Sequence, residues 1–141
     1  MRQFFSFVIA VAASAATFYQ CSPASEKKVE EAQEEIKRDI VREKQEVATE
    51  LGALRDDIND RLDKISTKLE TAGDKSKAEL EEAKQNLEEQ RTKIEKSLDE
   101  IDQATDSAWD DIQQRARKTG SDIKIEFQEL GEKIDKALKG D

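Results

Sequence analysis

The sequence predicts an all-α protein, a long antiparallel helical hairpin of coiled-coil type with a short third helix folding back. The first observation is a row of apolar residues, spaced three or four apart, on a single helix face: Val47, Leu51, Leu54, Ile58, Leu62, Ile65 and Leu69. The second is a break near Gly73, after which the same pattern resumes. The third is a composition of 40% charged and 35% hydrophobic residues, which suits a thin seam between helices rather than a thick core.

Residues 1–21 differ from the rest and are expected to be an export signal. A basic start at Arg2 precedes an uncharged apolar run, FFSFVIAVAASAATFY, at residues 4–19. This run is shorter than the roughly 20 residues of a membrane span, and a basic start with a shorter run is typical of a signal peptide.

The only cysteine, Cys21, follows this run, and residues 22–25 then form a short polar tether. The layout resembles a bacterial lipoprotein signal, in which the thiol is acylated and becomes the mature N-terminus. The resemblance implies that Cys21 is the lipid attachment site. Two alternatives stay open: ordinary signal cleavage near residues 13–15, which leaves a soluble exported protein, and an uncleaved apolar anchor.

Residues 26–141 are expected to form one helical domain, with a first helix at about 26–72 capped by Ser25. Its start is weakly patterned, and Gly52 is tolerable within so long a helix. Gly73 suits a left-handed helix end, and Ser76 with Glu79 forms a capping box for a second helix.

The second helix is expected at about 76–118 and the third at about 122–139, separated at Gly120 and Ser121. The third helix would fold back and form a three-helix end with residues 27–46 and 108–116. Alternatively, the second and third helices run on as one. Apolar residues recur every eleven positions, as at Val47, Ile58, Leu69 and Leu80, which predicts long and nearly straight helices.

Residues 68–101, KLETAGDKSKAELEEAKQNLEEQRTKIEKSLDEI, and 104–114, ATDSAWDDIQQ, resemble a set of small bacterial helical-hairpin proteins. These proteins are described as coiled-coil or stress-associated, and their function is uncharacterised. The shared features are a Lys/Ala/Glu hairpin and a small residue with Trp before an acidic pair. The resemblance implies a fold and no reaction.

Composition argues against several kinds of site. The chain has no His and one Cys, so the commonest general base and the zinc ligands of Cys type are missing. Its acidic clusters lie in helical pattern without the glycine turn of a calcium loop. The net charge of −9 disfavours nucleic acid. We therefore expect no catalysis, no cofactor, no metal site and no nucleic-acid partner.

Two aromatic residues are candidate sites for a partner or for the core. Trp109, the only Trp, can anchor a partner or lipid surface, or fill the seam where three helices meet. The second interpretation is favoured because Trp is usually well buried and small Ala108 leaves room beside it. Phe127 on the last helix is the expected packing neighbour.

These observations predict an exported, lipid-anchored helical spacer or interaction protein of the bacterial cell envelope, on the periplasmic side of a membrane. Its expected partners are the membrane, through the N-terminal lipid or anchor, and a protein that the sequence does not identify. A homodimer is also consistent, because long thin seams often self-associate. The alternative function is an apolipoprotein-like or stress-protectant amphipathic protein that acts on membrane surfaces.

Overall fold

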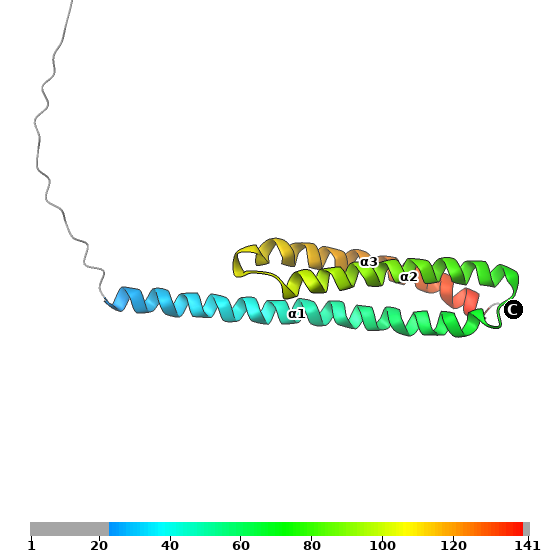
Figure 1. Ribbon diagram of the computed structural model, residues 1–141, viewed down its shortest axis with the longest axis horizontal. Helices are drawn as coiled ribbons and strands as arrows, with labels where there is room; N and C mark the ends of the chain where they lie inside the picture. Colours follow the sequence, from blue (N-terminus) through cyan, green and yellow to red (C-terminus); the bar gives the residue numbers. More distant parts are fainter. Residues whose placement is uncertain (1–22, 140–141) are drawn as a thin grey trace, which may run out of the picture.

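A computed structural model describes residues 23–139 of the chain and places three helices side by side (Figure 1). These are α1 (Pro23–Leu69), α2 (Asp74–Asp102) and α3 (Trp109–Lys139), with a 3-10 turn, η1 (Asp106–Ala108), before α3. Helices α1 and α2 form an antiparallel hairpin, and α3 folds back against both of them. The predicted fold class is therefore confirmed. The expected export signal with Cys21 lies outside the described residues, as does Ser22.

Helix α1 is a single helix of 47 residues, about 70 Å long at 1.5 Å per residue. It begins at Pro23, so the prediction that residues 23–25 belong to a tether is wrong. Proline is well suited to the first turn of a helix, because the amide hydrogen it lacks would have no helical partner there.

The first part of α1 extends alone beyond the other two helices (Figure 1). Side chains 27–38 are all exposed, and contact with the core begins near Ile40. The predicted three-helix end containing residues 27–46 is therefore wrong for most of that stretch. Helices α2 and α3 are each about 30 residues long and cannot cover all 47 residues of α1.

The hairpin turn lies where the sequence predicts it, but its local structure differs. Gly73 has φ −70° and ψ 162°, and its carbonyl accepts a hydrogen bond of 2.8 Å from the Lys77 amide. Gly73 is therefore the N-cap residue of α2 rather than a left-handed helix end. The predicted capping box is wrong because the helix begins at Asp74, which places Ser76 inside its first turn.

The second boundary was predicted wrongly. Helix α2 ends at Asp102 rather than near residue 118, and α3 continues through Gly120. The chain turns at Thr105, which is extended at φ −80° and ψ 160° and accepts a hydrogen bond of 3.1 Å from the Ala108 amide. The second and third helices are therefore neither separated at residues 118–121 nor continuous.

Gly120 has a packing role instead. A Cβ atom built there would lie 3.0 Å from Cδ2 of Leu51, which is only 2% exposed. Glycine therefore lets α3 approach α1 closely, and this explains its place in the middle of a helix.

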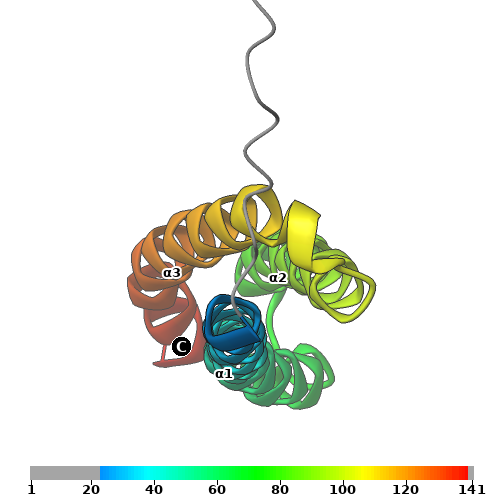
Figure 2. The same cartoon turned by 90° about the vertical axis from the view of Figure 1, so that its left-hand side faces the viewer.

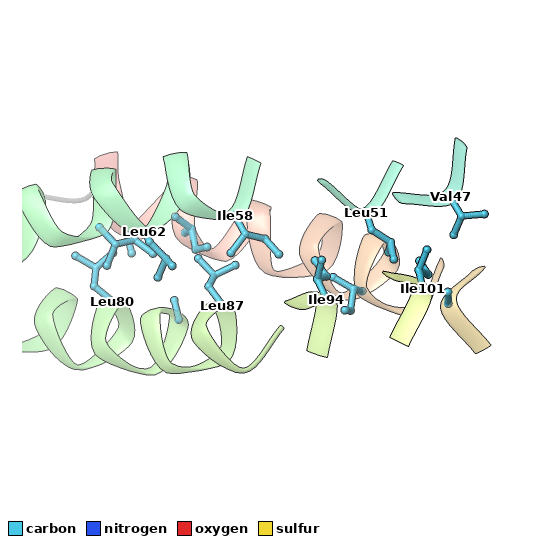
Figure 3. Close-up of a cluster of buried hydrophobic side chains, with 14 of the residues drawn as sticks. Val47, Leu51, Ile58, Leu62, Leu80, Leu87, Ile94 and Ile101 are labelled. Atoms are coloured by element: carbon cyan, nitrogen blue, oxygen red, sulfur yellow. The ribbon is translucent and has the colours of Figure 1, made fainter. Parts of the chain in front are cut away.

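Helix α3 lies along both α1 and α2 (Figure 2), and buried apolar side chains fill the seam between the helices (Figure 3). Facing residues meet in pairs along the seam, with Ile58 near Leu87 and Val47 near Ile101. Burial in α2 repeats every seven residues rather than every eleven, at Leu80, Leu87, Ile94 and Ile101 and in a second row at Ala83, Gln90 and Ser97. This is the heptad pattern of a coiled coil.

Candidate functional site

The two aromatic candidates lie far apart. Trp109 and Phe127 are both on α3, 18 residues from each other, and so are separated by about 27 Å along the helix. The prediction that they pack together is wrong, because it required a chain break near Gly120 that the structure does not have. Cys21, the third candidate, lies outside the described residues.

Trp109 is a core residue at the first position of α3, with 1% of its surface exposed. Its indole Nε1 donates a hydrogen bond of 2.9 Å to Oε2 of Glu43 on α1. The same oxygen accepts a second hydrogen bond, of 3.0 Å, from Nε2 of Gln113. The carboxylate therefore satisfies the buried indole and fixes the start of α3 against α1.

The residue next to Glu43 holds the other side of this junction. Lys44 Nζ donates a hydrogen bond of 2.5 Å to the carbonyl oxygen of Ala104, in the loop between α2 and α3. Lys44 Nζ also lies 5.8 Å from the centroid of the Trp109 ring, within cation–π range. We call Glu43, Lys44, Ala104, Trp109 and Gln113 the loop junction. It fastens the α2–α3 loop to α1 at the point where α1 leaves the bundle.

Phe127 belongs to a second contact between α1 and α3, made by Arg61. The Arg61 guanidinium lies 5.3 Å from the Phe127 ring centroid, and its Nη1 donates to Oδ1 of Asp135 at 3.0 Å. Nη1 also donates to the Gly131 carbonyl oxygen at 3.3 Å. A Cβ at Gly131 would lie 3.3 Å from Arg61 Nη2, so glycine leaves room for the guanidinium. The loop junction and the Arg61 contact both fix α3 against α1, and neither presents a reacting group.

One polar residue in the core is incompletely satisfied. Gln90 is 3% exposed; its Nε2 donates to Oε2 of Glu126 at 3.3 Å, and its Oε1 has no hydrogen-bond partner. A buried acceptor without a partner lowers stability by about 1–3 kcal/mol. Polar residues at such heptad positions can fix the register of packed helices.

The projecting part of α1, residues 27–38, carries apolar side chains outside the bundle. Val29 and Ile36 are 56% and 58% exposed, and Val41, next to the first residue that contacts the core, is 64% exposed. Acidic and basic side chains surround them and pair along the helix, as in the 3.2 Å contact between Arg38 and Glu34. Such exposed pairs add only tenths of a kcal/mol each, so this part of α1 is held mainly by helix propensity.

Within residues 23–139, no three His, Cys, Asp or Glu side chains are placed to hold a metal ion. The same residues include no helix long and apolar enough to cross a membrane.

The sequence missed the partners of Trp109, since Glu43 and Lys44 lie 66 and 65 positions away and have no local signature. It did contain a signal for the α2–α3 boundary. Thr105, Asp106 and Ser107 are residue types that favour helix starts, and Asp110 and Asp111 are acidic residues in the first turn of α3.

Searches with the chain found no matching protein-family model, no matching curated protein and no matching solved structure. The resemblance to small bacterial helical-hairpin proteins therefore stays a prediction.

Proposed function

We propose that the protein is a lipid-anchored helical spacer of a bacterial cell envelope and has no catalytic activity. Acyl chains on Cys21 would hold the N-terminus at a membrane on its periplasmic side. The projecting part of α1 would then carry the three-helix bundle away from that membrane, where the charged faces of the bundle are presented to a protein partner.

The observation that carries the proposal is the continuity of α1. This helix begins two positions after Cys21 and runs for 47 residues. The side chains of residues 27–38 are all exposed. The loop junction pins the end of the bundle at Glu43, which is 20 residues, or about 30 Å, from the start of α1. A stiff segment of that length next to an anchor acts as a spacer.

The alternative is an amphipathic protein that lies on a membrane surface. That function would use the apolar residues of the projecting part of α1, or would require the bundle to open and expose its seam. Val29 and Ile36 in the projecting part favour it, since they are exposed, as does Val41 beside it. Their number is small, however, and the four basic residues at 27–38 are balanced by four acidic ones, which gives little attraction to anionic lipid.

The two functions differ in how far the bundle stands from the membrane. The only Trp of the chain, Trp109, lies beside Glu43. Its distance from the membrane surface therefore reports the length of the spacer. The experiment reconstitutes the membrane-purified protein into vesicles that contain a dansyl-labelled lipid and measures energy transfer from Trp109. A variant that lacks residues 28–38 removes three helical turns and keeps the face of the helix, because eleven residues make three turns.

The spacer predicts weak transfer for the wild type and strong transfer for the deletion variant, whose Trp109 lies about 16 Å nearer the anchor. As a control, circular dichroism of the deletion variant should show that its three-helix bundle remains folded. Strong and equal transfer from both proteins would show that α1 lies along the surface, and would favour the alternative. Failure of the wild type to stay on vesicles would contradict anchoring.

A further inference from the structure

A hollow lies between the start of α2 and the end of α3. It has a volume of about 790 Å³, and its walls come from residues 75–86 and 130–139. These segments meet at the end of the bundle where α1 turns into α2, far from the projecting part of α1 (Figure 1). Its size lies in the range of small-molecule sites.

Missing side-chain volume explains the hollow. Ala83 and Ala137 occupy buried positions on the facing helices, and both are 5% exposed. The neighbouring buried positions on the same helices carry larger residues, Leu80 and Leu87 on α2 and Ile134 on α3. Both alanines line the hollow, and their short side chains fill less of it than leucine or isoleucine would. Half-buried Leu130 adds to the apolar lining.

The charge around this groove is opposite in sign to that of the chain. Four lysines line it, Lys75 on α2 and Lys133, Lys136 and Lys139 on α3, against two acidic residues, Glu79 and Glu82. The whole chain has a net charge of −9. All four lysines are exposed, so their stems can cover apolar surface while their amines stay in water.

We propose that this groove binds a long-chain carboxylate. The acyl chain would lie along the apolar lining that includes Ala83, Leu130 and Ala137, and the carboxylate would pair with the lysine amines at the rim. The groove extends along α2 from residue 75 to residue 86, about 16 Å, which suits an extended chain rather than a compact ligand. The proposal does not rest on the spacer function, because it involves neither Cys21 nor the projecting part of α1.

Dodecanoate is a suitable probe, and the full chain is the protein to test. A photoreactive dodecanoate analogue followed by peptide mapping should label residues 75–86 and 130–139. Titration calorimetry should show one site that prefers dodecanoate over dodecyltrimethylammonium, a cation with the same chain, by about tenfold or more.

Two kinds of variant test the groove separately. Ala83→Leu fills it, with Ala78→Leu as its control because Ala78 is exposed on the same helix. The double variant K133E/K136E reverses the rim charge, with K96E/K124E as its control at exposed lysines outside the groove. Both groove variants should weaken dodecanoate binding about tenfold or more, and both controls should stay within about twofold of the wild type.

Because Lys133 and Lys136 are exposed, the charge variant tests the site even if Ala83→Leu disturbs folding. Labelling confined to residues 1–22, or spread along all three helices, would overturn the proposal. Equal binding of the cationic amphiphile would show that the lysine rim has no role. Unchanged affinity in both groove variants would show that dodecanoate binds elsewhere.

Discussion

Replacing Gly120 by Ala tests whether this glycine permits close packing or ends a helix. In an open helix interior, Gly→Ala stabilises by about 1 kcal/mol. At Gly120 the new Cβ would lie 3.0 Å from Leu51 Cδ2, and Leu51 is packed in the core at 2% exposure. Overpacking of this kind typically costs about 1–3 kcal/mol. We therefore expect Gly120→Ala to lower the free energy of unfolding by about 0–2 kcal/mol.

Gly52 provides the matched control, because a Cβ built there has nothing within 4 Å. Gly52→Ala should raise the free energy of unfolding by about 1 kcal/mol, so the two variants should differ by about 1–3 kcal/mol. The assay is urea unfolding monitored by far-UV circular dichroism. Free energies of unfolding are compared only between variants whose free energy has the same slope against urea concentration.

The background variant Leu51→Ala separates the two interpretations of Gly120. Leu51→Ala alone should destabilise by about 2–5 kcal/mol, but it removes the atom that an added Cβ would meet. In that background Gly120→Ala should become stabilising, by about 1 kcal/mol. If Gly120→Ala stays equally destabilising without the Leu51 side chain, the packing argument is refuted and a role in ending the helix is favoured.

Three further results are expected of the core. Trp109→Phe removes the indole donor to Glu43 and should lower the free energy of unfolding, measured with urea, by about 1.5–3 kcal/mol or more. A smaller loss would mean that this hydrogen bond is weak. Gln90→Leu removes a buried acceptor without a partner and should stabilise by about 1 kcal/mol or more, whereas Gln85→Leu, at an exposed position of the same helix, should change stability by less than about 0.5 kcal/mol. Trp109 fluorescence should resist quenching by acrylamide until the protein unfolds; ready quenching in the native state would contradict its 1% exposure.

Much of the architecture could be predicted because it depends on local repetition. The spacing from Val47 to Leu69 defines one buried face, and five of the seven residues that α2 buries are apolar and lie three, four or seven positions apart. Gln90 and Ser97 are the exceptions, because a count of apolar residues passes over polar side chains that the seam nevertheless buries.

The boundary between α2 and α3 was missed because glycine has two structural uses. Gly120 lies in a sequence that is also typical of a helix end, and only the distance to Leu51 shows that it serves packing. That distance depends on how α3 lies against α1, which local sequence does not determine. The helix-start residues near Thr105 were the better signal for the break.

For the candidate site, the sequence predicted that Trp109 fills a seam, and the structure buries it. It could not predict Glu43 and Lys44 as partners, because their approach depends on the register of three helices. The groove beside Ala83 was missed for a related reason. Each alanine is an ordinary residue within its own helix, and the hollow is lined by residues of both α2 and α3, whose approach the local sequence does not determine.

We propose that the bundle is held at a membrane through Cys21, and the intact mass of the protein, purified from the membranes of cells that produce it, tests this most directly. The expected mass is that of residues 21–141 plus the acyl groups carried by Cys21. A mass equal to that of an unmodified chain, whether full-length or cleaved at another position, would contradict it.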